Sequence, residues 1–237
     1  MAFQKIVAPT PKELFISQLV RQILSGELKA GEKLPTEREL AEMMDINRST
    51  AHSGLEELQH MGLVRMEPRR GNFVADYAKD GDFNTLTAIA KYGDGDFDVA
   101  MRISLVELRN SIVGGALIRL AKTATSKDLS LLRSMMEKHR AAEEPGTDIT
   151  TAAMHLLEFN TELVRLSGNT MYLLILNSFG ERNLPFWERC VKHWGMDSPV
   201  KQEEIIIDML EKGKGHDAAM YLENMFESYM EDHNMRR

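Results

Sequence analysis

Between residues 34 and 74 the hydrophobic positions follow a helical period twice. Thr36 stands three residues before Glu39, which is the capping-box signature of a helix start. The apolar face of this first helix comprises Leu40, Met43 and Met44. Residues 45–47 interrupt the pattern, and the side-chain oxygen of Asn47 can cap a second helix. The apolar stripe of that second helix comprises Ala51, Leu55 and Leu58.

The segment after Gly62 has the pattern of two short strands. Residues 63–66 and 72–75 form the expected strands, and Pro68-Arg69-Arg70-Gly71 is the tip between them. Two helices joined by a short turn and followed by such a hairpin match the plan of a winged helix-turn-helix.

A further helix precedes this motif. Thr10-Pro11 marks its start, with proline at its preferred first position, and Ser25-Gly26 marks its end. Its broad apolar face comprises Phe15, Ile16, Leu19, Val20, Ile23 and Leu24. Residues 28–35 form a short extended connector to the motif.

From Phe83 onward every segment has a helical pattern. The expected helices cover residues 83–92, 97–123 or 99–123 (capped by Asp96 or Asp98), 126–143, 147–166 or 148–166 (opened by Thr147 or Asp148), 170–192, 198–211 and 216–233, with a kink at Pro185 in the fifth. About seven such helices form an antiparallel all-α bundle, so the fold is mainly α. We expect a winged helix domain at 1–77, a polar linker at 78–82 and the helical domain at 83–237.

Composition indicates a globular protein. Hydrophobic residues make up 43% and charged residues 27% of the 237 positions, and no run approaches the roughly 20 apolar residues of a membrane helix. The first twelve residues lack the apolar core of a signal peptide. The single cysteine, Cys190, excludes an intrachain disulfide and fits a reducing cytoplasm.

The net charge of −7 does not by itself indicate a nucleic-acid partner. Residues 1–77 carry ten Lys and Arg against eleven Asp and Glu, so any DNA binding depends on where the cations lie. The cations that can share one face are Lys12, Arg38, Arg48, Arg65, Arg69 and Arg70. Phosphate contacts of this kind make binding steeply salt-dependent, and a nearly neutral domain favours a dimer.

These N-terminal segments resemble the DNA-binding domain of the GntR family of bacterial transcription regulators. The matching pieces are LPTERELAE, INRST, a leucine-rich helix ending in HMGLV, and RRGNFV. The resemblance implies a double-stranded operator approached by Arg38, Arg48, Ser49, Thr50 and Gly71. The second helix and the wing add Asn47, His52, Arg69 and Arg70. The family's usual Arg-Glu-Ala is here His52-Ser53-Gly54, which leaves one fewer permanent cation and a helix-weakening glycine.

The C-terminal pattern resembles the effector domain of the FadR-like branch of that family, through LVELRNSI and EFNTELVRLSGNTMYLLILNSF. The resemblance implies a homodimer whose bundle core binds a small effector. Many members bind a metal through an aspartate and a histidine four residues apart plus two later histidines. The corresponding positions here are Leu156, Asn160, Glu203 and Asn224 or Met225, and leucine cannot ligate a metal. We therefore expect no metal and no other cofactor.

The fatty-acid regulators of this branch share the asparagine at Asn160, the SGN turn and the segment ending at Asn177. The resemblance implies that their effector, a long-chain acyl-CoA, is one candidate here and that Arg109 lies in the ligand region. An acidic residue at Glu227 disfavours a CoA phosphate, so an organic acid bound through Arg109 is the other candidate. The expected effector-contacting residues are Arg109, Asn160, Asn177 and Glu203.

Each of these residues also has a structural interpretation. Arg109 can pair with Glu107 or a neighbouring helix, and the two asparagines can be satisfied core amides. Four histidines without partners at metal-binding spacing are expected at the surface: His139, His193, His216 and His233.

Two other functions compete with a ligand-responsive regulator. One is a DNA-binding protein whose effector site is metal-dependent or lost. The other is a helical-bundle hydrolase, but no nucleophile–base pair, phosphate-cradling loop or complete metal set supports it. We therefore expect no catalytic residues.

Overall fold

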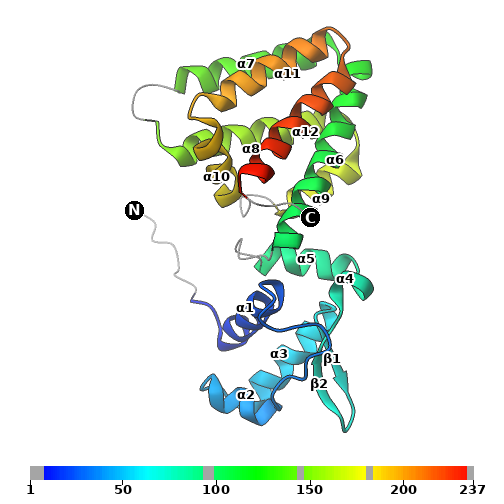
Figure 1. Ribbon diagram of the computed structural model, residues 1–237, viewed down its shortest axis with the longest axis vertical. Helices are drawn as coiled ribbons and strands as arrows, with labels where there is room; N and C mark the ends of the chain where they lie inside the picture. The colour runs from blue at the N-terminus through cyan, green and yellow to red at the C-terminus, as the bar shows by residue number, and fades with distance from the viewer. Residues whose placement is uncertain (1–7, 93–98, 143–146, 180–183, 234–237) are drawn as a thin grey trace, which may run out of the picture. The chain divides into compact units, whose positions relative to one another are not determined.

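The computed structural model describes residues 8–92, 99–142, 147–179 and 184–233. The chain divides into two compact units, residues 1–98 and 99–237 (Figure 1). The described part of the second unit is entirely helical, and the two strands of the described chain lie in the first.

The first unit contains a winged helix-turn-helix. Its elements are α1 (Pro11–Leu24), α2 (Glu37–Met43), α3 (Arg48–His60), β1 (Val64–Glu67), β2 (Gly71–Val74), α4 (Tyr77–Asp80) and α5 (Phe83–Tyr92). Helices α1 and α2 begin with capping boxes, in which Thr10 and Thr36 exchange hydrogen bonds with the glutamate three residues on. Asn47 caps α3, so all three helix starts read from the sequence are confirmed.

The wing is an antiparallel pair, and its strands lie one residue from their expected positions. Val64 pairs with Val74 and Glu67 with Gly71, so the tip is residues 68–70. The connector before α2 joins this sheet through a bridge between Lys33 and Phe73, with the Leu34 N–H donating to the Asn72 carbonyl at 2.9 Å. The wing is therefore joined to the chain segment that precedes α2 as well as to α3, which it follows.

The core of this unit forms where α1 crosses α3. The fully buried members include Leu19, Val20, Ala51, Leu55 and Leu58. Gly54 lies against the ring of Phe15: a Cβ at position 54 would stand 2.3 Å from Phe15 Cδ1. The glycine that weakens α3 by propensity is thus the residue that lets α1 approach.

One apolar face was assigned wrongly from the sequence. On α2 the buried residues are Leu40 and Ala41, whereas Met43 is 74% exposed. The helix has only two turns, and its buried side lies between positions 40 and 41; position 43 is rotated by roughly 200° from position 41 and so leaves that side.

The segment expected as a polar linker contains a helical turn, α4, and α5 packs against α1. The Thr85 hydroxyl lies 2.6 Å from the Cβ position of Gly62, at the end of α3. Helix α5 is therefore part of the first compact unit, and the division of the chain falls after Asp98. The polar composition of residues 76–82 reflects exposure rather than a lack of structure.

The second unit is an antiparallel bundle. Its helices are α6 (Val99–Thr123), α7 (Ser126–Ala142), α8 (Ile149–Leu166), α9 (Thr170–Phe179), α10 (Leu184–Trp194), α11 (Ser198–Glu211) and α12 (Gly215–Asp232). The single helix expected over 170–192 is two helices, and Pro185 lies in the first turn of α10. Proline is tolerated there because the first N–H groups of a helix have no intrahelical partner.

The bundle is organised around α6, which packs along α12 (Figure 1). At Gly215 a Cβ would lie 2.7 Å from Ala121 and 2.8 Å from Ile118, so the start of α12 approaches α6 closely. One core cluster joins α6, α7, α8, α11 and α12 around residues such as Leu117, Leu163 and Ile206. A second joins α6, α8, α10 and α12 around Trp187 and Phe226.

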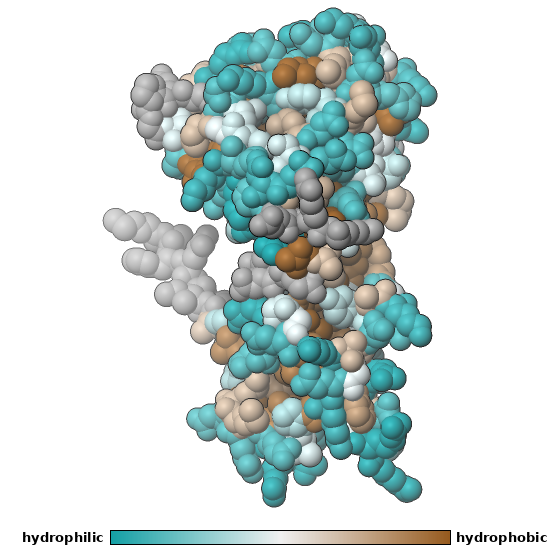
Figure 2. Space-filling view, in the orientation of Figure 1, coloured by the Kyte–Doolittle hydropathy of each residue, from teal (hydrophilic) through white to brown (hydrophobic). Residues whose placement is uncertain are grey.

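On the face shown in Figure 2, hydrophilic residues predominate over both units and apolar residues are scattered. None of the described helices is long and apolar enough to cross a membrane.

Candidate functional site

The first turn of α3 is shaped by Asn47. Its Oδ1 accepts from the Thr50 backbone N–H and from the Ser49 hydroxyl, both at 2.7 Å. The side-chain oxygen of Asn47 is therefore engaged in capping, while Ser49 stays exposed at the start of the helix. This arrangement fixes where α3 begins and which way its first turn faces.

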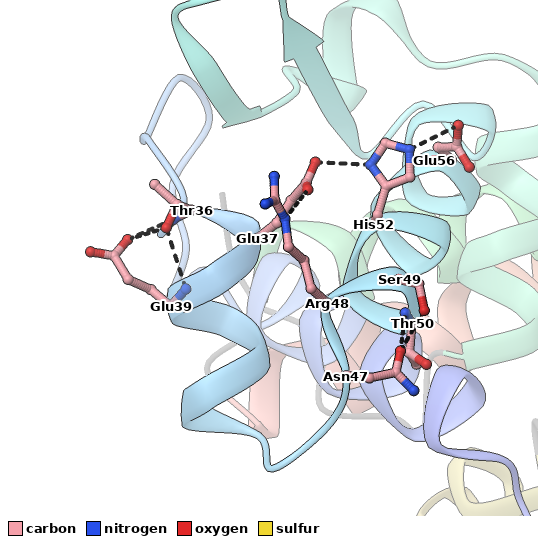
Figure 3. Close-up of polar contacts among 9 residues, drawn as sticks. All are labelled: Thr36, Glu37, Glu39, Asn47, Arg48, Ser49, Thr50, His52 and Glu56. Carbon is pink, nitrogen blue, oxygen red and sulfur yellow. Dashed lines mark hydrogen bonds and ion pairs between the residues drawn. The ribbon is translucent and has the colours of Figure 1, made fainter.

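Glu37, the first residue of α2, connects α2 to α3 (Figure 3). Its Oε1 lies 2.8 Å from His52 Nδ1 and its Oε2 lies 3.3 Å from Arg48 Nε. On the other edge of the imidazole, His52 Nε2 lies 3.4 Å from Glu56 Oε1. Arg48 is 75% exposed at its side chain although Nε is bonded. Two expected DNA-contacting residues are thus held by one carboxylate.

This cluster shifts the pKa values of its members. The hydrogen bond to Glu37 and the charge of Glu37 raise the pKa of His52, Glu56 adds to the rise, and Arg48 opposes it. The hydrogen bond from His52 in turn lowers the pKa of Glu37. A neutral imidazole donates from only one nitrogen, so the two carboxylate contacts are both satisfied only by protonated His52.

The remaining cations of the expected interface are exposed. Arg38 lies in α2 and forms a surface pair with Glu42 at 3.6 Å. At the wing tip Arg69 has a φ of 65°, and Arg70 pairs with Glu67 at 2.6 Å.

Gly71 closes the tip with a φ of 114°, and a Cβ there would lie 2.9 Å from Lys33 Cε. A side chain at this position would be strained and crowded, so the glycine lets the connector approach the wing.

In the second unit Arg109 is buried between two aromatic rings. Its Cζ lies 4.3 Å from the centre of the Trp187 ring and 4.4 Å from that of Phe226. Its Nη2 donates to Asn160 Oδ1 at 2.7 Å, and Asn160 Nδ2 donates to the Leu156 carbonyl at 2.7 Å. The structure thus brings together two of the four expected effector-contacting residues.

The environment of this guanidinium is unusual. Burial lowers the pKa of Arg109 to about 9, so it remains charged at neutral pH. Within the described residues its Nε has no hydrogen-bond partner, Nη1 donates to Asn110 Oδ1 at 3.0 Å, and no carboxylate is among the groups that shift its pKa. Of the two structural partners expected for Arg109, the neighbouring helix is the one observed, through Asn160 of α8, rather than Glu107. Burial raises the pKa of the nearby Cys190 thiol, which makes it unreactive.

The metal set typical of the FadR-like branch does not fit these residues. Leu156 is fully buried in the core, and both ends of the Asn160 amide are engaged. No group of three His, Cys, Asp or Glu side chains in the described ranges is arranged to hold a metal.

Glu203 pairs with a histidine, not with Arg109. His139 Nδ1 donates to Glu203 Oε1 at 2.6 Å, and both side chains are buried. The His139 ring stacks on His155 at 4.0 Å. The expectation that His139 is a surface residue is wrong, because α7 turns it toward α11 and α8. The expected exposure of His216 and His233 is confirmed, whereas His193 is half-buried. Asn177 is exposed on α9.

Sequence reasoning missed Glu37 and the aromatic partners of Arg109. From the sequence alone, Glu37 is an acidic residue whose charge complements the dipole at the start of a helix. Its contacts lie 11 and 15 residues away on another helix, so no local pattern reveals them.

Two family models match the chain. The model described as "Bacterial regulatory proteins, gntR family" matches residues 14–74, and the FCD domain model matches residues 104–228. The chain belongs to the GntR family. It is a helix-turn-helix transcriptional regulator of the FadR-like type, with an FCD effector-binding domain, which confirms the resemblance noted from the motifs.

Curated relatives agree with this assignment. The chain is 25% identical over 181 residues to the HTH-type transcriptional regulator Mce2R of Mycobacterium tuberculosis, covering 76% of this chain and 72% of that one. It is 28% identical over 178 residues to a fatty acid metabolism regulator protein of Shewanella amazonensis, covering 73% and 69%.

A solved structure shares the fold. It is described as "Lar controls the expression of the Listeria monocytogenes agr system and mediates virulence", and it aligns with a TM-score of 0.59 at 19% identity. The alignment covers 94% of this chain and 96% of that one.

Proposed function

We propose that this GntR-family regulator binds a double-stranded operator as a homodimer, and that a small organic anion bound at Arg109 controls operator affinity. The DNA part is supported by the exposed row of polar and cationic side chains along α2, α3 and the wing. The contacting residues are Arg38, Arg48, Ser49, Thr50, His52, Arg69 and Arg70, with Asn47 shaping the helix start and Gly71 the wing.

The observation that carries the effector part is the buried guanidinium of Arg109. A buried charge without a carboxylate is costly, and aromatic rings offset only part of that cost. A ligand carboxylate would supply the anionic partner that the described residues around Arg109 lack, and Asn160, which already accepts from Nη2, would orient the guanidinium. Asn177 and Glu203 are weaker candidates, since one is exposed and the other pairs with His139.

Two chemical classes satisfy this chemistry. A small carboxylic acid is one, because its charge complements the guanidinium that Trp187 and Phe226 enclose. An acyl-CoA is suggested by the relatives named fatty acid metabolism regulator, although the exposed Glu227 on α12 disfavours a CoA phosphate.

The DNA part is tested with a duplex that the protein itself selects from a library of about 20 randomised base pairs, which spans two half-sites one helical turn apart. Arg48→Ala is expected to weaken binding to the selected duplex by about 1–3 kcal/mol if it reads a base. Equal binding by Arg48→Ala would reject this docking of α3. Sedimentation of the free protein tests the dimer.

The effector part is tested by thermal unfolding with small mono- and dicarboxylic acids and with acyl-CoAs. A ligand at one hundred times its dissociation constant should add about 2.7 kcal/mol to stability. The stabilisation should disappear in Arg109→Met and should be accompanied by weaker operator binding in the wild type. A ligand that stabilises Arg109→Met equally binds elsewhere, and no response to either class would favour a regulator that has lost its effector.

A further inference from the structure

The interface contains an acidic residue where DNA-binding surfaces usually carry cations. Glu37 is only 21% exposed at its side chain, and its two oxygens are divided between two residues of α3. A carboxylate that merely complemented the start of α2 would need no partner on α3. The divided contact is therefore a tertiary feature of the reading surface (Figure 3).

We propose that Glu37 is a positioning residue for DNA reading: it holds Arg48 and His52 in one hydrogen-bonded arrangement on the exposed face of the recognition helix. This inference rests on the proposed docking of α3 on the operator.

The contact with Arg48 determines which atoms remain for DNA. Glu37 bonds Nε at 3.3 Å, and the side chain as a whole is 75% exposed. The terminal nitrogens can then address the two acceptors of a guanine edge, the commonest specific contact of arginine in the major groove. An untethered arginine has several rotatable bonds and can instead reach any nearby phosphate. Tethering thus favours base reading over backbone binding.

The contact with His52 links reading to protonation. Three charged groups face the imidazole: Glu37 from α2, and Arg48 and Glu56 from α3 itself. The carboxylates outweigh the arginine, so the pKa of His52 is raised and the imidazolium bridges Glu37 and Glu56. Losing the proton breaks one of these bridges and removes one positive charge from the surface. Operator affinity should therefore fall as pH rises through the raised pKa.

The carboxylates also limit indiscriminate binding. With protonated His52 the four side chains Glu37, Arg48, His52 and Glu56 sum to zero charge. Such a surface gains little from phosphates alone, because non-specific affinity is set by net cation–phosphate pairing. Discrimination then depends on the geometry that Glu37 maintains.

The experiment uses the full chain and two probes: the duplex selected by the wild type, and a scrambled duplex of the same length and composition. Glu37→Gln should bind the scrambled duplex more tightly and lower the ratio of selected to scrambled affinity by about tenfold, the size of one base contact. The matched control is Glu56→Gln, which removes one carboxylate from the same surface but leaves the Glu37–Arg48 contact. It should raise binding to both duplexes alike and preserve the ratio.

A pH series distinguishes the positioning role of Glu37 from a purely structural one. A purely structural role would leave the pH dependence of operator affinity unchanged. Wild-type affinity for the selected duplex should fall several-fold between about pH 6 and pH 8.5, a range that starts near the ordinary pKa of histidine and extends above it. The midpoint should shift to lower pH in Glu37→Gln, and His52→Gln should remove the transition.

The outcomes separate the two proposals. If Arg48→Ala loses discrimination while Glu37→Gln keeps the full ratio and the wild-type pH profile, the positioning role is rejected and the docking stands. If the wild type selects no sequence, or Arg48→Ala reads DNA as the wild type does, the docking fails and this inference fails with it.

Discussion

Replacing Gly54 with alanine tests how the recognition helix is packed. A Cβ at this position would lie 2.3 Å from Phe15 Cδ1 and 2.6 Å from Cε1. Carbon atoms in contact stand about 3.5–4.0 Å apart, so the ring must retreat by more than 1 Å. Phe15 is only 2% exposed and is surrounded by buried side chains of α1 and α3, so the space to retreat is small.

Two opposing effects determine the size of the change. Overpacking a well-filled core costs about 1–3 kcal/mol. Alanine stabilises a helix interior by about 1 kcal/mol relative to glycine. The expected net destabilisation is therefore about 1 kcal/mol, and up to about 2. For a unit of this size each kcal/mol lowers the unfolding temperature by roughly 4–8 °C.

Calorimetry of the full chain measures this shift, and hydrogen exchange in α1 and α3 assigns it to the first unit. Phe15→Leu provides the control, because a smaller side chain leaves room for the new methyl group. The double variant should be more stable than the sum of the single changes by about 1–3 kcal/mol. A rise in the unfolding temperature of Gly54→Ala, with additive double-variant energies, would show that helix propensity alone acts here and that the steric argument is wrong.

Two further predictions concern stability. Burial lowers the pKa of His139, but the hydrogen bond and charge of Glu203, with Glu158, outweigh burial and raise it. The stability that His139 contributes is thus complete below its unfolded pKa and is lost as pH rises through the folded value. Glu203→Gln should reduce this pH dependence to the part that Glu158 retains and cost about 3 kcal/mol, seen in unfolding temperatures from pH 5.5 to 8.5; a pH profile like that of the wild type would contradict it. Thr36→Ala removes the cap of α2 and should cost about 1 kcal/mol in the first unit, whereas Thr36→Ser should retain most of it.

Local chemistry in the sequence determined the helix starts and the wing. Thr10, Thr36 and Asn47 cap their helices because an oxygen at the N-cap satisfies backbone N–H groups within the same turn. The two strands, each within one residue of its expected position, follow from the same short-range patterns. These signals also carried the family resemblance, so the winged helix and the helical bundle were predictable without tertiary information.

The tertiary structure decided which residues meet across elements. Gly54 is a weak helix former by propensity, yet its missing side chain lets α1 approach α3. His139 has no partner at metal-binding spacing, but the folded bundle buries it against Glu203, 64 residues away in sequence. The Glu37 carboxylate and the aromatic enclosure of Arg109 arise in the same way. Such contacts depend on helix crossings, which hydrophobic periodicity alone does not specify, whereas caps and turns depend only on neighbouring residues.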